Sequence, residues 1–249
     1  MGACAAPPTQ QPAPAAEGAA VEWGYEGEIG PENWSTLSGN FATCGLGTEQ
    51  SPIDLSEPAP SDEFGPLELN YAATPITVLN NGHTIELEYE PGSTLTFNGQ
   101  TYELVQFHFH NPSEHTLTGE ASPLEAHLVH RDNNGNLAVI GVFLMLGEAN
   151  PFLAQFWDAL PAAAGETEVE GEINVRDLLP EDLSYHTYTG SLTTPPCSEG
   201  VRWLVLRDTV TISQEQVDAF TAIYSGNARP VQPLNDRDLL TNADDVSLR

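Results

Sequence analysis

The feature that most constrains this chain is a succession of short segments rich in β-branched and aromatic residues, separated by turn-forming residues. Asn98-Gly99 lies between segments 94–97 and 101–109, and Asp132-Asn133-Asn134-Gly135 lies between segments 124–130 and 137–146. Asn-Gly is the strongest short signal for a β-hairpin because both residues tolerate a positive φ. The pattern predicts antiparallel neighbouring strands, with further strands at 76–79, 84–89, 201–207 and 210–212.

Helical signals are few and lie at the edges of this pattern. Asn150 can cap a short helix that has Pro151 at its first position. Ser213 and Gln216 form a capping box before an apolar stretch. We therefore expect a mainly β fold, with a large, mostly antiparallel central sheet and short peripheral helices.

The domain organisation is predicted from composition. Residues 1–20 are rich in Ala, Pro and Gln and read as a disordered linker, because they offer almost nothing to bury. Residues 21–249 contain no second linker and no internal repeat, so a single domain is expected. With 249 residues, of which 40% are hydrophobic, the chain can supply a substantial core.

The charge balance excludes one class of partner. The chain has 36 acidic against seven basic residues, a formal charge of −29, and every basic residue is Arg. Such a surface repels phosphate backbones, so nucleic acid is not an expected partner. An acidic shell suits high salt, where charges are screened over about 3 Å at 1 M, and we expect adaptation to a saline or otherwise extreme habitat.

Cysteine usage and hydropathy bear on location. Cys4, Cys44 and Cys197 lack the close spacing of a zinc ribbon or a redox pair, so one long-range disulfide with one cysteine left over is the simplest arrangement. This favours an oxidising compartment. No apolar stretch of about 18 residues predicts a transmembrane segment. Gly2-Ala3-Cys4 resembles the end of a lipoprotein signal, which would make Cys4 a lipid anchor.

Six of the seven histidines fall between residues 83 and 130. Because side chains alternate along a strand, His108 and His110 share one face, and Glu125 and His127 share a face of the next strand. Two imidazoles from one strand and a third from its neighbour predict the three-ligand arrangement of a catalytic zinc site, although copper, iron and cobalt remain open from ligand type alone. Gln106 and Glu125 each precede a histidine by two residues and can orient its ring from the second shell. The competing interpretation is a set of polar strand residues without metal.

Several ordered blocks of the sequence resemble the α-class carbonic anhydrases, especially the secreted bacterial ones, across residues 23–249. The resemblance rests on Trp23-Gly24-Tyr25, Gln50-Ser51-Pro52, Asn80-Asn81-Gly82-His83, Gln106-Phe107-His108-Phe109-His110, Ser113-Glu114-His115-Thr116, Glu125-Ala126-His127-Leu128-Val129-His130, Ser191-Leu192-Thr193-Thr194-Pro195-Pro196-Cys197 and Asn227-Ala228-Arg229-Pro230. It implies the fold of that family and zinc-dependent, reversible hydration of carbon dioxide to bicarbonate and a proton.

The resemblance also implies roles for individual residues. His108, His110 and His127 correspond to the ligands of Zn²⁺, with Gln106 and Glu125 behind them. Thr193 corresponds to the residue that orients the nucleophile and donates to Glu114, Thr194 to a neighbouring polar contact, and His83 to the proton shuttle. Tyr25 and Asn81 correspond to residues that order water, and an apolar wall for carbon dioxide is expected from Val129, Val139, Leu192, Val201 and Trp203.

Further expectations follow from the same resemblance. Cys44 and Cys197 correspond to the disulfide pair of bacterial members, which implies a secreted or periplasmic protein. Sulfonamides and anions are the expected inhibitors, and a homodimer is an expected assembly. His115 and His130 are expected to be structural, and His186 is assigned no chemistry. Glu86 departs from the Asn or Gln frequent at its position, and its charge is expected to raise the pKa of His83.

Two other classes of protein compete with this interpretation. A cupin-type metalloprotein also fits His108, His110 and Glu114 with His127, but its glycine-flanked second motif is missing and the Thr193-Thr194-Pro195-Pro196 loop has no role in it. A binding module that has lost catalysis would usually lack a zinc histidine, whereas all three are present.

Overall fold

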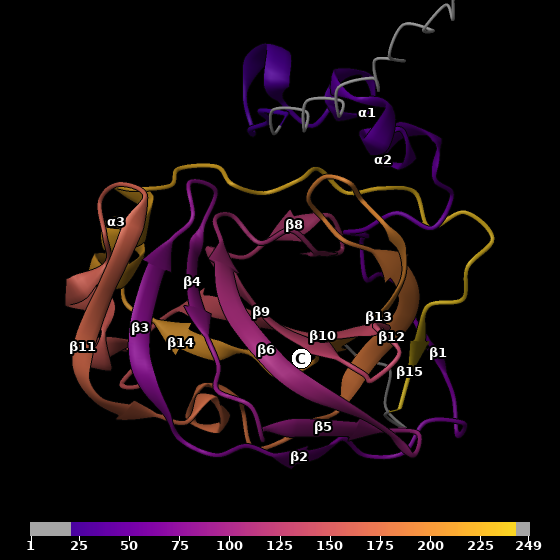
Figure 1. The fold of residues 1–249 in the computed structure, drawn as a ribbon. Helices are drawn as coiled ribbons and strands as arrows, with labels where there is room; N and C mark the ends of the chain where they lie inside the picture. The colour runs from indigo at the N-terminus through magenta and orange to yellow at the C-terminus, as the bar shows by residue number, and fades with distance from the viewer. Residues whose placement is uncertain (1–20, 243–249) are drawn as a thin grey trace, which may run out of the picture.

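The computed structural model describes residues 21–242, and its main feature is one large sheet (Figure 1). The predicted linker at 1–20, and Cys4 with it, lie outside the described residues. Ten strands follow one another across the sheet in the order β1-β15-β12-β13-β10-β9-β6-β4-β3-β11, and β2, β5 and β14 attach beside this path. The bounds are β1 (Ala59–Pro60), β2 (Glu68–Asn70), β3 (Thr74–Asn80), β4 (Ile85–Glu88), β5 (Thr94–Phe97), β6 (Gln100–His110), β9 (Leu124–Arg131), β10 (Leu137–Leu146), β11 (Gly165–Ile173), β12 (Tyr185–Ser191), β13 (Glu199–Leu206), β14 (Val210–Ile212) and β15 (Leu240–Thr241).

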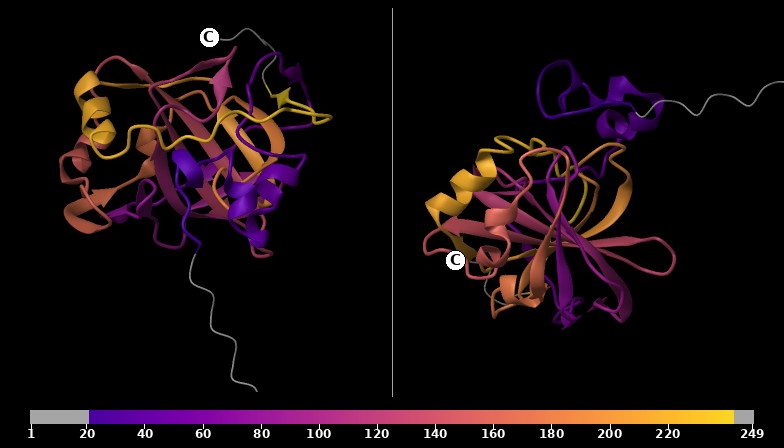
Figure 2. Two further views of the ribbon diagram at one scale, coloured as in Figure 1. Left: turned by 90° about the horizontal axis from the view of Figure 1, so that it is seen from above. Right: turned by 60° about the vertical axis from the view of Figure 1, so that its left-hand side comes forward.

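Helices are short and lie around this sheet, as both views of Figure 2 show. The α-helices are α1 (Trp34–Leu37), α2 (Thr43–Leu46) and α3 (Gln214–Thr221), and the 3₁₀ helices are η1 (Gly27–Ile29), η2 (Gly39–Phe41), η3 (Leu153–Gln155), η4 (Trp157–Ala159) and η5 (Val175–Leu178). A separate pair of strands, β7 (Thr116–Leu117) and β8 (Glu120–Ala121), forms a small hairpin. In the part of the chain that the structure describes, no helix is long and apolar enough to cross a membrane.

The expectation of a mostly antiparallel sheet needs correction, because the sheet is mixed. β10 is antiparallel to β9 on one side but parallel to β13 and β14 on the other, and β1 is parallel to β15. The chain leaves β10 and returns beside it only after η3, η4, β11, η5 and β12, so a long crossover replaces a hairpin at this point. Turn signals identify only strands that are adjacent in sequence, so they do not predict the parallel pairing of β10 with β13.

The central strands separate an apolar face from the face that carries the histidines. On β6, Phe107 and Phe109 are fully buried in the larger core cluster, and the histidine between them points to the other face. On β10, Ile140 packs into the same cluster, whereas Val139 and Phe143 pack with Trp203 in a second cluster. This second cluster lies beside the histidines and forms one wall of the site.

Most of the elements predicted from the sequence are present. The hairpin around Asn98-Gly99 joins β5 to β6, and β14 has the predicted bounds. Ser213 accepts from the Gln216 N–H and the Gln216 side chain returns to the Ser213 N–H, which confirms the capping box at α3. The sequence pattern did not predict β11 or β12. In β11, exposed glutamates alternate with Thr and Val, which gives no signal of a buried strand.

The predicted pairing of cysteines is confirmed. Cys44, in α2, is bonded to Cys197, in the loop after β12. The bond holds the N-terminal segment with α1 and α2, indigo in Figure 1, to the loop that carries Thr193 and Thr194.

Candidate metal centre

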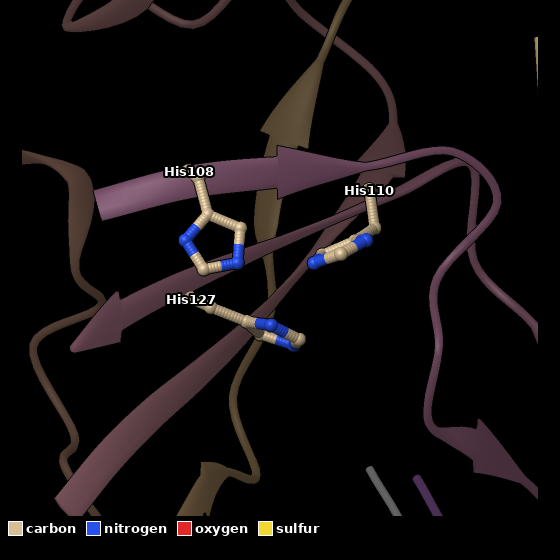
Figure 3. Close-up of side chains that lie close together, drawn as sticks. All are labelled: His108, His110 and His127. Atoms are coloured by element: carbon tan, nitrogen blue, oxygen red, sulfur yellow. The ribbon is translucent and has the colours of Figure 1, made fainter. Parts of the chain in front are cut away.

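Three histidines converge from two neighbouring strands (Figure 3). His108 and His110 lie on β6 and His127 on β9, and the ladder places His108 directly opposite His127. One ring nitrogen of each histidine lies within 4.8 Å of the others. The period of two in β6 and the register with β9 together explain this convergence.

The outer nitrogens of two of these rings are held by acceptors. His108 Nδ1 lies 2.8 Å from Gln106 Oε1, and His110 Nδ1 lies 2.7 Å from the backbone oxygen of Asn227. In both rings Nδ1 therefore carries the proton and Nε2 keeps its lone pair. His110 Nε2 is buried and has no hydrogen-bond partner, as expected for an atom that faces a metal position.

The third ring is held from behind by a carboxylate. His127 Nε2 lies 2.9 Å from Glu125 Oε1, although the approach is not aligned for a linear hydrogen bond. Burial would raise the pKa of Glu125, but the neighbouring His115 and His127 hold that pKa well below its ordinary value. For His127, burial lowers the pKa, and the charges of Glu125 and Glu114 outweigh it and raise the pKa.

The donor set fits a zinc ion. Burial lowers the pKa of His110, and burial together with the other two histidines lowers that of His108 well below its ordinary value, so both rings are neutral and able to ligate near neutral pH. Three imidazole nitrogens face one position, and hydrogen-bond acceptors behind two of the rings hold them in place. This is the arrangement of the protein ligands in a catalytic zinc centre, which leaves one coordination position for water.

His115 and His130 are engaged elsewhere. His115 Nδ1 contacts Glu125 Oε1 at 2.8 Å, and its Nε2 contacts the Tyr188 hydroxyl at 2.7 Å. His115, Glu125 and His127 therefore form a second close group, but both nitrogens of His115 already have partners. His130 Nε2 lies 2.7 Å from the Tyr71 hydroxyl, and burial lowers its pKa to about 4. His186 is also buried and lies on β12, which β13 and β10 separate from β9 in the sheet.

Glu114 lies beside the histidines, but its predicted hydrogen bond is not formed in this structure. Its Oε1 accepts from the Arg229 backbone N–H at 2.8 Å. Its Oε2 is buried without a hydrogen-bond partner, 3.5 Å from His110 Nε2. Thr193 is buried, and within residues 21–242 its hydroxyl does not hydrogen-bond to Glu114, so that contact remains a prediction.

A small cavity opens in front of the metal position. It has a volume of about 130 Å³ and is lined by Trp23, Tyr25, Asn81, His83, Thr84, Glu86, Gln106, His108, His110 and Thr194. The structure therefore brings Tyr25, Asn81, His83 and Thr194 together with two of the three histidines. A larger cavity of about 570 Å³ adjoins it and shares Trp23, Tyr25 and His83.

His83 lies at the rim with its ring against Trp23. Burial lowers the pKa of His83, and no contribution from Glu86 raises it. The expected rise of the His83 pKa is therefore corrected: the carboxylate of Glu86 faces Asn81 and Gln106, while the indole shields the imidazole.

The predicted apolar wall is assembled in one cluster. Val139, Val201 and Trp203 are buried there, and Val129 and Leu192 pack against them. The indole of Trp203 meets the ring of His127 edge-on, with centroids 4.8 Å apart. The predicted apolar wall is therefore in contact with His127.

Two residues that hold the site were missed in the sequence. Asn227 fixes His110 through its backbone oxygen, and its side-chain amide donates to the Phe109 and His83 oxygens. Arg229 donates from its backbone to Glu114 and from its buried guanidinium to the Cys44, Gln50 and Ser51 oxygens. Both belong to the block used for the family resemblance, which was the only available signal.

Fold and site together define a class of protein: a mainly β domain whose central strands bring three histidines together, with an apolar cluster in contact with one of them. Comparisons with known proteins identify the family within this class. Residues 29–243 match the family model of eukaryotic-type carbonic anhydrase. The chain belongs to the carbonic anhydrase family and is an enzyme of that family, which excludes the cupin-type alternative.

Similar proteins include bacterial carbonic anhydrases. That of a Nostoc species is 45% identical over 87% of this chain and 84% of its own length. That of Neisseria gonorrhoeae is 45% identical over 90% and 89%. The α-carbonic anhydrase of Thermovibrio ammonificans, solved in complex with the inhibitor sulfanilamide, has a TM-score of 0.86 and 44% identity, covering 89% of this chain and 100% of that one.

Proposed function

We propose that this protein catalyses the zinc-dependent, reversible hydration of carbon dioxide to bicarbonate and a proton. The observation that carries the proposal is the convergence of three imidazole nitrogens, with the outer nitrogens of His108 and His110 hydrogen-bonded to fixed acceptors. A zinc ion held by His108, His110 and His127 supplies a Lewis acid that lowers the pKa of a coordinated water to about 7.

Glu114 and Thr193 then orient the nucleophile. Glu114 Oε2 is buried and free to accept a hydrogen bond from the Thr193 hydroxyl, which leaves the threonine oxygen able to accept one in turn. We expect the Thr193 backbone N–H to donate to a substrate or inhibitor oxygen. Thr194 lines the cavity and supplies a further polar contact there.

The apolar wall suits the substrate. Carbon dioxide has no charge and no net dipole, so it gains from a surface that excludes water. Val139, Val201 and Trp203 provide that surface, with Val129 and Leu192 at its edge.

His83 exports the proton released in each turnover. It lines the same cavity as His108 and His110, and burial lowers its pKa from the ordinary value. Imidazole is the side chain whose ordinary pKa allows proton exchange near neutral pH. Tyr25 and Asn81 line the same cavity as His83, His108 and His110 and are suited to order water there.

Inhibition and location follow from the same assignment. A primary sulfonamide, deprotonated at nitrogen, is an anion that competes for the metal position, and small anions are expected to do the same. The disulfide favours a secreted or periplasmic protein, and we retain a lipid anchor at Cys4, a saline habitat and a homodimer as proposals.

Stopped-flow hydration of carbon dioxide tests the proposed function. The purified protein should accelerate hydration, the rate should fall to that of buffer after a chelator has removed the metal, and added zinc should restore it. A rate no faster than buffer for the zinc-loaded protein would refute the assignment.

A further inference from the structure

Glu86 contacts two parts of the site that the proposed function gives different roles, proton export and metal binding. It lies on β4, in the cavity wall, directly across the ladder from His108. Its Oε2 accepts from Asn81 Nδ2 at 3.2 Å and from Gln106 Nε2 at 3.3 Å. One carboxylate oxygen therefore contacts both the turn that carries His83 and the side chain behind His108.

The carboxylate determines the direction of the next hydrogen bonds. An ionised carboxylate only accepts, so Gln106 must turn its NH₂ group toward Glu86 and its Oε1 toward His108. His108 Nδ1, 2.8 Å from that Oε1, must then be the donor. The lone pair of His108 is consequently left on Nε2, the nitrogen available to a metal.

A neutral amide at position 86 would remove this constraint. The side chain of Gln both donates and accepts, so Gln106 could face it with either end of its own amide. In one orientation the Gln106 NH₂ group would point at His108 Nδ1, which would favour the tautomer with its proton on Nε2 and block metal binding.

We propose that Glu86 is a positioning residue that fixes the tautomer of His108 through Gln106 and thereby slows the release of zinc. The inference rests on the proposed function, because it assigns His108 to the zinc.

Zinc release provides a test that does not depend on activity. The zinc-loaded full chain is mixed with excess chelator and the liberated metal is followed by absorbance. The pH is 8, because burial and the nearby Glu88 raise the pKa of Glu86 and the carboxyl must be ionised. We expect Glu86→Gln to release zinc about fivefold faster, below the 10- to 100-fold typical of partners in direct contact with a ligand.

Glu88→Gln is the matched control. Glu88 lies two residues further along β4, opposite Gln106 in the ladder, but it is exposed and does not line the cavity. The hydrogen bond from Gln106 goes to Glu86, so this variant removes the same charge without removing a hydrogen bond to Gln106. It should release zinc at the native rate. Equal acceleration by both variants would mean that the negative charge acts through space, and the inference would fail.

A double-mutant cycle tests the route through Gln106. In a Gln106→Leu background the amide is gone, so Glu86→Gln should produce no further acceleration. An unchanged fivefold effect in that background, or native release by Glu86→Gln alone, would overturn the inference while leaving the proposed function intact. Failure of the native protein to retain zinc or hydrate carbon dioxide would instead refute the proposed function.

Discussion

The imidazole of His83 lies flat against the indole of Trp23, with ring centroids 3.7 Å apart and planes inclined by 6°. This stacking covers one face of the ring and is the contact that accompanies its partial burial. The residue assigned to carry protons is thus packed against an aromatic neighbour.

Replacing Trp23 by Ala should therefore raise the pKa of His83 toward its ordinary value. The physical reason is that desolvation disfavours the charged imidazolium, and removal of the indole restores water to the ring. The measurement is an NMR titration of the His83 ring proton. Trp23→Phe, which keeps an aromatic face, should give a smaller rise, and a fall in the pKa would contradict this interpretation.

Replacing His83 by Ala should slow turnover by about tenfold at low buffer concentration, because proton transfer by a positioned side chain is lost. The value of kcat should fall while kcat/KM changes little, since the proton leaves after carbon dioxide has reacted. Added imidazole should restore kcat. Stopped-flow rates at several buffer concentrations check this, and identical rates for variant and native protein would remove His83 from the mechanism.

His130 should make stability depend on pH. Its pKa is about 4 in the folded protein because it is buried as a neutral acceptor for Tyr71, and it is about 6.5 when unfolded. The folded state resists protonation, so its contribution is complete above pH 6.5 and is lost as the pH falls toward 4, by about 2 kcal/mol at pH 5. Urea unfolding at pH 7 and pH 5 should show a smaller loss for His130→Gln than for the native protein. Equal losses would contradict the assignment.

Removing the disulfide should lower stability through the unfolded chain. Cys44 and Cys197 are 153 residues apart in sequence, and closing a loop of that length contributes about 5 kcal/mol. The Cys44→Ser, Cys197→Ser double variant should unfold at correspondingly lower urea concentration. Native protein treated with reductant should behave as this variant does, and an unchanged midpoint in both would show that the bond adds nothing.

Salt should stabilise the protein. With a formal charge of −29, self-repulsion opposes the compact state at low ionic strength, and we expect the melting temperature to rise by about 5 °C or more into the molar range of NaCl. A variant with Glu166, Glu168, Glu170 and Glu172 of β11 changed to Gln should show a weaker response, because these exposed side chains lie along one edge strand. A flat response of the native protein would leave its acidity unexplained.

Local patterns predicted most of the strands and the convergence of His108, His110 and His127. The period of two in β6 put His108 and His110 on one face, and the hairpin turn after β9 placed its neighbours correctly. The capping box at Ser213 followed from two side chains three residues apart. Each of these features depends on interactions between residues close in sequence.

Long-range features could not be derived in this way. The parallel pairing of β10 with β13 depends on a crossover of more than fifty residues, and no side-chain pattern records its direction. The acceptor for His110 is a backbone oxygen, which every residue possesses, 117 positions away. No side-chain pattern therefore identifies Asn227 as the partner of His110, and the only indication was the resemblance of residues 227–230 to the carbonic anhydrase family.

The hydrogen bond from His110 to Asn227 has a consequence for biosynthesis. A chain still emerging from the ribosome contains both ligand strands long before residue 227 has been made, yet His110 then lacks the oxygen that orients its ring. A product truncated before residue 227 would therefore carry all three histidines and still lack the acceptor that fixes the ring of His110.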